Sequence, residues 1–202
     1  MLLQNRVQPD GEFALVWKPV DQITARWKPM EGAGLEHLVL HAKAGGYLAK
    51  SQVVGEDDGT RYAFTYEIQK DQGWRVLSFR IDSIDGQTLT CTSPSEGLWH
   101  DARGARLKDL DGCIDVDFTF TCFTNTLPVR RMDFGKRQAR SFQMLYVYFD
   151  SLVPLADGQR YTCIEPGRRF LFEATDGSFT RDIEFDDYGF VQNYPDLYQR
   201  VD

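Results

Sequence analysis

Apolar side chains recur at every second position over much of this chain. The clearest run extends from Ile114 to Phe120, where apolar residues occupy the even-numbered positions and polar residues the odd-numbered ones. The same alternation returns in segments 62–68, 77–81 and 179–185. A strand turns successive side chains to opposite faces, so this period is typical of β-strands with one apolar and one polar face. The pattern predicts a sheet that is covered on one side.

Asp-Gly pairs separate these segments. Glycine accepts the positive φ of tight hairpin turns, so each pair predicts a short antiparallel connection. The pairs are Asp58-Gly59, Asp85-Gly86, Asp111-Gly112, Asp157-Gly158 and Asp176-Gly177. The best helix candidate, Val20 to Trp27, is short and is stopped by Pro29. We predict an all-β fold with minor helix, in which an antiparallel sheet is barrel-like or strongly curved because it must hide its edges.

Composition limits the domain count and the partners. The chain has 202 residues, of which 13% are aromatic, and no Pro-rich, Ser-rich or low-complexity segment divides it. We therefore predict a single domain over residues 1–202. The 30 acidic residues outnumber the 23 Lys and Arg residues, and the net charge of -7 repels a phosphate backbone. We expect no nucleic acid as a partner.

No targeting, membrane or metal signal is found in the sequence. The longest apolar runs, such as Met144 to Phe149, are far shorter than the roughly 20 residues of a membrane-spanning helix. Residues 1–10 lack the apolar stretch of a signal peptide, so we expect a cytoplasmic location and four reduced cysteines. His37 and His41, about 13 Å apart on a predicted strand, cannot share one metal ion, and we expect no metal or other cofactor.

The densest group of polar residues lies between Asp115 and Arg131. Asp115 and Asp117 project from the same face of one predicted strand, about 7 Å apart by strand geometry. Residues 124–128 are interpreted as a wide turn, and Arg130 and Arg131 follow it. In one interpretation an arginine folds back on the carboxylates as an internal ion-pair network. In the other, the same groups line a pocket and bind hydroxyls or an acidic head group. Both interpretations stay open.

Four motifs carry a resemblance to a known family. They are LKDLDGCIDVD at 107–117, FTNTLPVRR at 123–131, QRYT at 159–162 and DYGFVQNYP at 187–195. Together they resemble the bacterial family called "putative glycolipid-binding", formerly a domain of unknown function, from about Glu36 to the C-terminus. The resemblance implies a β-barrel-like fold and a glycolipid or other amphipathic small molecule as ligand. The chain departs from the family pattern at Cys122, which replaces a proline, and at 76–79, which replace a more basic stretch.

We expect a glycolipid- or lipid-binding protein without catalytic activity, whose sheet encloses an apolar cavity. The alternatives are an enzyme that acts on a sugar or acyl substrate through Asp115 and Asp117, and a structural protein with an internal ion-pair network. The sequence contains no nucleophile-elbow serine, glycine-rich phosphate loop or local Cys–His signature. Ligand identity and oligomeric state stay open. The candidate ligand-contacting residues are Asp115, Asp117, Thr124, Asn125, Arg130, Arg131, Trp99, Gln159, Arg160, Tyr161 and Tyr194.

Overall fold

The computed structural model of this protein describes residues 17–202, and one sheet of 14 strands dominates them. The strands are β1 (Gln22–Pro29), β2 (Leu35–Lys43), β3 (Gly46–Asp57), β4 (Thr60–Asp71), β5 (Val76–Ser83), β6 (Thr88–Ser95), β7 (Leu98–Asp101), β8 (Asp115–Phe118), β9 (Ala139–Val147), β10 (Pro154–Glu165), β11 (Arg169–Ala174), β12 (Thr180–Phe185), β13 (Val191–Tyr194) and β14 (Tyr198–Arg200). Two 3₁₀ turns, Lys108–Leu110 and Phe123–Asn125, and the helix α1 (Thr126–Arg131) interrupt the strands.

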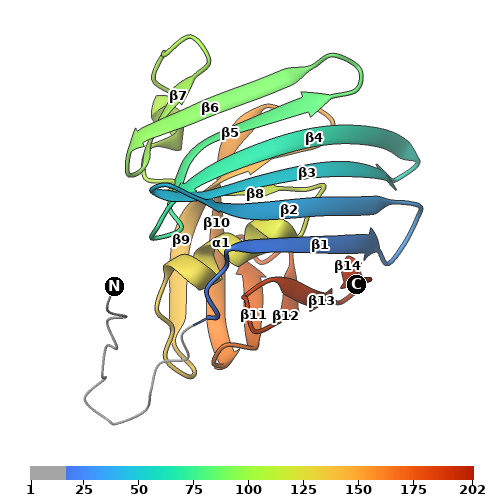
Figure 1. The fold of residues 1–202 in the computed structure, drawn as a ribbon, viewed down its shortest axis with the longest axis vertical. Coiled ribbons are helices and arrows are strands. Elements are labelled where there is room, and N and C mark those ends of the chain that lie inside the picture. The colour runs from blue at the N-terminus through green and yellow to red at the C-terminus, as the bar shows by residue number, and fades with distance from the viewer. Residues whose placement is uncertain (1–16) are drawn as a thin grey trace.

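The sheet consists of two antiparallel meanders. β1 to β7 form the first and β9 to β14 form the second, and pairing between β1 and β14 joins them. β8 is added to β9 in parallel, whereas the other neighbouring strands of the described chain are antiparallel. The sheet curves, but its edge strands β7 and β8 do not pair with each other within residues 17–202 (Figure 1). The prediction of an antiparallel, strongly curved sheet is confirmed, and the barrel is not closed.

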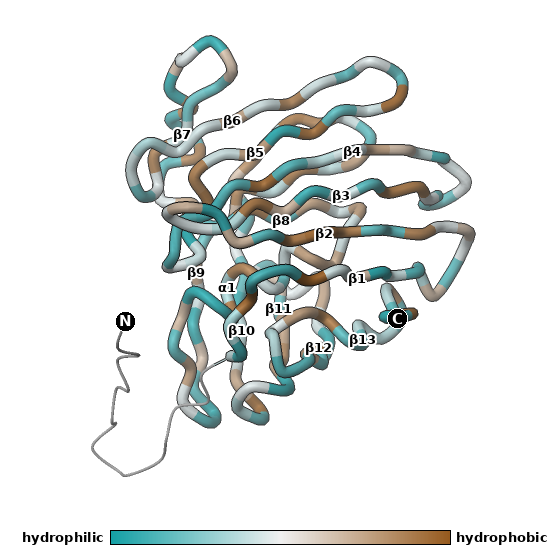
Figure 2. The backbone as a smooth tube through the Cα atoms, in the orientation of Figure 1, coloured by the Kyte–Doolittle hydropathy of each residue, from teal (hydrophilic) through white to brown (hydrophobic). Residues whose placement is uncertain are grey.

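The predicted alternation appears as alternating burial. In β4 the side chains of Phe64, Tyr66 and Ile68 are buried, while Thr65 between them is exposed. Figure 2 shows hydrophobic and hydrophilic segments following one another along the strands, with hydrophilic turns at many strand ends. Burying the apolar face stabilises the fold by roughly 25 cal/mol per Å² of apolar surface removed from water.

Four of the five Asp-Gly pairs form turns with glycine at positive φ: Gly59 at 76°, Gly86 at 89°, Gly112 at 91° and Gly177 at 77°. Three of them join neighbouring antiparallel strands, whereas Asp111-Gly112 lies between the first 3₁₀ turn and β8, so the antiparallel connection predicted there is wrong. The turn predicted at Asp157-Gly158 is wrong, because both residues lie inside β10. A Cβ at Gly158 would lie 2.1 Å from the Thr175 hydroxyl oxygen. Glycine is required there for close approach of a neighbouring turn.

The segment predicted to be helical is a strand in the structure, and the segment predicted to be a wide turn is largely helical. The helix candidate at Val20 to Trp27 is wrong, because Ala25 and Trp27 are buried with a period of two in β1. The wide turn expected at 124–128 belongs to the second 3₁₀ turn and α1. Four residues of α1, from Thr126 to Val129, are buried. A helix of six residues whose first four are buried has no polar face along its length, and so it shows no amphipathic stripe.

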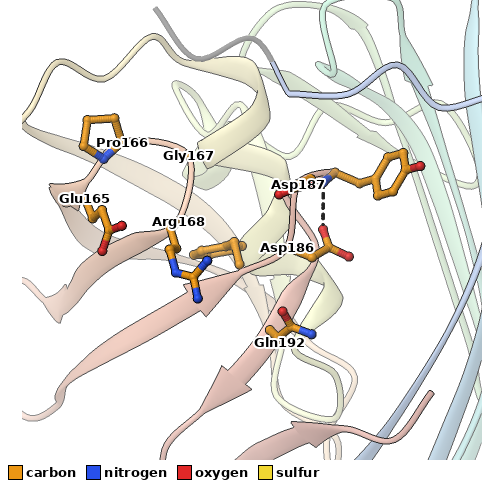
Figure 3. A pocket seen from close by; sticks show the side chains of 9 residues that line it. Glu165, Pro166, Gly167, Arg168, Asp186, Asp187 and Gln192 are labelled. Carbon is orange, nitrogen blue, oxygen red and sulfur yellow. Dashed lines mark hydrogen bonds between the residues drawn. The ribbon is translucent and has the colours of Figure 1, made fainter.

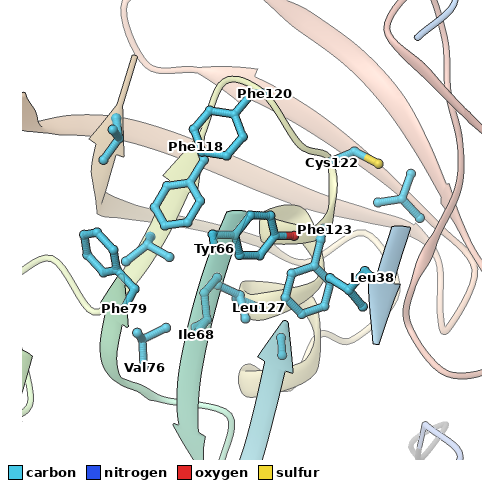
Figure 4. Close-up of a cluster of buried hydrophobic side chains, with 14 of the residues drawn as sticks. Leu38, Tyr66, Ile68, Val76, Phe79, Phe118, Phe120, Cys122, Phe123 and Leu127 are labelled. Atoms are coloured by element: carbon cyan, nitrogen blue, oxygen red, sulfur yellow. The ribbon is translucent and has the colours of Figure 1, made fainter. Parts of the chain in front are cut away.

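Helix α1 and the 3₁₀ turn before it lie inside the curve of the sheet. Figure 4 shows Phe123 and Leu127 beside Tyr66 and Ile68 of β4. The ring of Phe120 stacks on that of Phe64 at 4.5 Å between centroids. Aromatic side chains therefore pack the interior in which we expected an apolar cavity. The residues that carry this packing are Phe64, Tyr66, Phe79, Phe118, Phe120, Phe123 and Phe190.

Candidate functional site

Asp115 and Arg131 form a buried ion pair. Arg131 Nη2 lies 2.6 Å from Asp115 Oδ2, and Arg131 Nε lies 3.1 Å from Oδ1. The Asp115 side chain has 0% exposure and that of Arg131 has 17%. Burial raises the pKa of Asp115, while the hydrogen bonds and the charge of Arg131 act against that rise. Bidentate geometry between a guanidinium and a carboxylate fixes the end of α1 on β8.

Asp117 is held by neutral groups. The Thr124 hydroxyl donates to Asp117 Oδ1 at 2.7 Å, and Gln159 Nε2 donates to Oδ2 at 2.7 Å. Burial raises the pKa of Asp117, and the two hydrogen bonds oppose this effect. Thr124 precedes α1 and Gln159 belongs to β10, so these bonds tie the helix to the second meander.

Three more of the predicted site residues lie in the same buried region. Asn125 Nδ2 donates to the Tyr161 hydroxyl at 2.8 Å. Tyr161 packs on Phe172, which in turn packs on Tyr194. Asn125, Tyr161 and Tyr194 are at most 5% exposed. The structure thus brings eight of the predicted residues together in the interior: Asp115, Asp117, Thr124, Asn125, Arg131, Gln159, Tyr161 and Tyr194.

The remaining three predicted residues lie elsewhere. Trp99 is buried at β7, where its indole N–H donates to the Cys113 carbonyl at 2.7 Å. Arg160 is exposed beside Glu173 at 3.6 Å, on the outer face opposite Gln159. Arg130 points away from Arg131 because successive helical side chains diverge by about 100°.

Arg130 reaches a different part of the molecule from Arg131. Its guanidinium lies 4.1 Å from the centroid of the Trp74 ring. It donates to the backbone carbonyl of Lys18 at 3.3 Å and to that of Tyr188. Burial lowers the pKa of Arg130 to about 10. The arginine pair predicted from the sequence therefore divides between two places, the interior network and the segment around Tyr188.

A pocket of about 480 Å³ opens beside that segment (Figure 3). The turn between β10 and β11 forms one wall, and the turn between β12 and β13 forms the other. Its lining residues are Glu165, Pro166, Gly167, Arg168, Phe185, Asp186, Asp187, Tyr188 and Gln192. We name this the β10–β13 pocket. The sequence did not predict this pocket. Asp187, Tyr188 and Gln192 belong to the 187–195 motif, but Tyr194, the one predicted site residue of that motif, does not line the pocket.

A hydrogen bond holds the turn that forms one wall of the β10–β13 pocket, whereas several polar side chains that line the pocket have no hydrogen-bond partner in the described chain. Asp186 Oδ1 accepts the backbone N–H of Tyr188 at 2.9 Å, which is the bond drawn in Figure 3. Glu165, Arg168 and Gln192 are exposed, and their side chains make no hydrogen bond or ion pair within residues 17–202. A carboxylate, a guanidinium and an amide thus face the pocket without a protein partner.

A second pocket, of about 180 Å³, lies near the turns that join β1 to β2 and β3 to β4. Aromatic rings and carboxylates line it together. Its side chains include Glu31, Glu56, Asp57, Tyr62, Phe149, Asp196 and Tyr198. Glu56 lies 3.7 Å from Arg61, and Asp196 lies 3.0 Å from Arg181. Two of the four carboxylates of this pocket are therefore paired with arginines, and those of Glu31 and Asp57 have no ion-pair partner in the described chain.

A third buried acid, Glu36, was not predicted from the sequence. Glu36 is 2% exposed, and its carboxylate accepts hydrogen bonds from Ser51 at 2.8 Å, Tyr66 at 2.6 Å and Thr121 at 2.6 Å. Burial raises the pKa of Glu36 to about 7. The available signal was its position, because Glu36 shares the inward register of β2 with Leu38 and Leu40.

The family whose description reads "Putative glycolipid-binding" matches residues 24–200 of the chain. This protein belongs to that family. A crystal structure of a DUF1089 family protein from Pseudomonas aeruginosa is similar to it, with a TM-score of 0.73 and 30% sequence identity over 82% of this chain and 92% of that one. No protein with a curated functional description matches. The predicted family resemblance is confirmed, and the match begins earlier than the predicted start at Glu36.

In this member of the putative glycolipid-binding family, the recognised motifs surround α1. The 107–117 motif ends in β8, and the 123–131 motif forms the second 3₁₀ turn and α1. The 187–195 motif contributes Tyr188, whose carbonyl accepts from Arg130. Within residues 17–202, the structure has no helix that is both long and apolar enough to cross a membrane.

Proposed function

We propose that this protein binds an amphipathic ligand of the glycolipid class without transforming it, and that the β10–β13 pocket receives the sugar. The observation that carries the proposal is the set of free polar ends in that pocket, contributed by Glu165, Arg168 and Gln192. The family description supports a binding role. The volume of about 480 Å³ is within the range of roughly 300–1,000 Å³ that small-molecule sites occupy.

The chemistry of the pocket suits a ring that carries hydroxyl groups. A carboxylate accepts hydroxyl protons, a guanidinium donates to hydroxyl oxygens, and an amide does both. Glu165, Arg168 and Gln192 supply one of each, and Phe185 with Tyr188 adds apolar surface for the face of a ring. Exposed polar ends bind such a group without losing an existing protein hydrogen bond.

The buried polar residues have a supporting role in this proposal. Asp115 holds Arg131, and thereby α1, from which Arg130 reaches the carbonyl of Tyr188 in the pocket wall. Asp115 and Asp117 line neither of the two pockets described above, so we assign no catalytic role to them. Rigid support behind a site preserves its geometry.

Titration with dodecyl maltoside, an uncharged glycolipid analogue, tests the proposal. Below its micelle concentration, the compound should raise the melting temperature of the protein because it binds the native state. Arg168→Ala and Gln192→Ala should each weaken binding by about tenfold, the effect of about one lost hydrogen bond. Calorimetric titration measures this directly.

Matched controls separate the pocket from the general surface. Arg103→Ala and Gln87→Ala remove exposed side chains of the same kinds in turns on the first meander. Both controls should bind dodecyl maltoside as the unchanged protein does. Equal affinity of all four variants, or no binding by the unchanged protein, would refute the proposed function.

A further inference from the structure

Two basic residues meet beside the β10–β13 pocket without a carboxylate between them. Lys70 ends the inward face of β4, and Arg130 extends from α1. Within residues 17–202, neither side chain lies within ion-pair distance of an acidic group. Buried charges are ordinarily paired, so an unpaired couple is unusual.

Lys70 is the more deeply buried of the two. Its side chain is 2% exposed, and its ammonium nitrogen has no hydrogen-bond partner in the described chain. The nitrogen lies 4.0 Å from the centroid of the Trp74 ring and 4.7 Å from that of Phe123. Burial and the nearby charge of Arg130 lower the pKa of Lys70 well below its usual range. Ring faces attract a cation but do not supply a counter-ion.

Arg130 faces the same indole at 4.1 Å from its centroid. Backbone carbonyls of Lys18 and Tyr188 accept from its terminal nitrogens, and its Nε has no partner among the described residues. Carbonyl oxygens satisfy hydrogen bonds without neutralising charge. One Trp74 ring thus covers two groups that would each bind an anion.

The backbone under Trp74 adopts a costly conformation. Trp74 has φ of 69°, in the left-handed region that large side chains rarely occupy. It ends a short turn closed by backbone bonds from Trp74 to Asp71 at 3.1 Å and from Asp71 to Arg75 at 3.0 Å. Gly73 beside it is exposed. Strained residues of this kind concentrate at ligand sites and switch segments.

We propose that Lys70 and Arg130 form a site for the anionic group of the amphiphile, a carboxylate or a phosphate, and that this group displaces the indole of Trp74. The inference rests on the proposed function, because it names the class of the same ligand. The guanidinium offers a planar fork and the amine a point charge, the two usual partners of such anions. Tyr188 connects this site with the β10–β13 pocket, since its carbonyl accepts from Arg130.

Parallel titrations with dodecyl phosphate, dodecyl maltoside and inorganic phosphate test the inference. Lys70→Met should weaken dodecyl phosphate binding by about tenfold or more, through loss of a charge-assisted contact, and leave dodecyl maltoside binding unchanged. The fold should persist, because methionine has a similar length and needs no polar partner. Lys28→Met, on the exposed side of β1, is the matched control and should bind both amphiphiles normally.

The outcomes separate the two proposals. Equal dodecyl phosphate affinity in Lys70→Met and the unchanged protein overturns the anion site, while dodecyl maltoside binding would leave the proposed function standing. If neither amphiphile binds, both proposals fail. Binding of inorganic phosphate that depends on Lys70, without binding of dodecyl phosphate, would overturn the lipid as the source of the anion and identify a site for free phosphate.

Tryptophan emission tests the displacement of the indole. Dodecyl phosphate should shift the emission of the unchanged protein to the red as Trp74 enters water, and Trp74→Phe should lose that shift while still binding. Retention of the full shift in Trp74→Phe would overturn the role of Trp74 as the cover, because Trp17, Trp27 or Trp99 would then be its source.

Discussion

Asp115 and Glu36 are both buried carboxylates, but only Asp115 faces a cation. Arg131 meets Asp115 with two nitrogens, whereas Glu36 has three hydroxyl donors and no ion-pair partner in the described chain. A guanidinium compensates a carboxylate charge, while hydroxyl groups only solvate it. The carboxylate of Asp115 is therefore paired with a cation, whereas that of Glu36 titrates near neutral pH. Asp115 anchors α1 through Arg131, and Glu36 binds a proton in the core below about pH 7.

Removing the cation should have the largest effect. Arg131→Met leaves Asp115 charged and without compensation, so we expect the free energy of unfolding to fall by about 3–5 kcal/mol. Urea denaturation at pH 7 measures it. Arg106→Met is the control, because Arg106 and Asp111 form an exposed pair at 2.7 Å, for which we expect a loss of at most about 1 kcal/mol. Equal losses in the two variants would show that the Asp115 pair is not buried in solution.

The second largest expected effect is a dependence of the free energy of unfolding on pH, caused by Glu36. Its folded pKa of about 7 exceeds the unfolded value of 4.5, so the native state binds the proton more tightly. Protonation of Glu36 therefore favours the native state below pH 4.5, and this contribution disappears as pH rises through 7. The loss amounts to about 3 kcal/mol, since one pKa unit corresponds to about 1.4 kcal/mol.

Glu36→Gln isolates this contribution. Urea denaturation at pH 5 and pH 8 should show that the unchanged protein loses more stability than the variant over this interval, by up to about 3 kcal/mol. Asp115 and Asp117, whose pKa values are also raised by burial, are present in both proteins, so their contribution cancels. Parallel curves for the two proteins would mean that Glu36 is already ionised, or solvated, at pH 5.

Asp115 and Glu36 also show how far the sequence determines the fold and the site. Alternation and Asp-Gly turns are local patterns, and they predicted the strands β4, β5, β8 and β12 and three hairpin turns. Pairing of Asp115 with Arg131 was one of two interpretations, because 16 residues separate them and one turn could bring them together. The partners of Glu36 lie 15, 30 and 85 residues away, on elements that only the curved sheet brings together.

Local sequence patterns also fail to predict structure where packing against the rest of the fold decides it. The first four of the six residues of α1 are buried, and so its sequence lacks the polar face from which a helix is recognised. Arg130 and Arg131 are adjacent in sequence and act in different places, which depends on how α1 is oriented within the sheet. The β10–β13 pocket arises from two turns separated by two strands, and no single motif contains it.

Thr121→Val should have the smallest effect on stability, and it tests which groups solvate Glu36. The Thr121 hydroxyl donates to Glu36 at 2.6 Å and accepts the backbone N–H of Phe123 at 3.0 Å, so it links the acid to the turn before α1. Its loss should cost about 1–2 kcal/mol at pH 8, where Glu36 is charged, and less at pH 5. Thr90→Val, on the outer face of β6, is the control and should change stability by at most about 0.5 kcal/mol at either pH. A cost for Thr121→Val that is the same at both pH values would mean that the hydroxyl serves Phe123 alone, and that Glu36 depends on Ser51 and Tyr66 for its solvation.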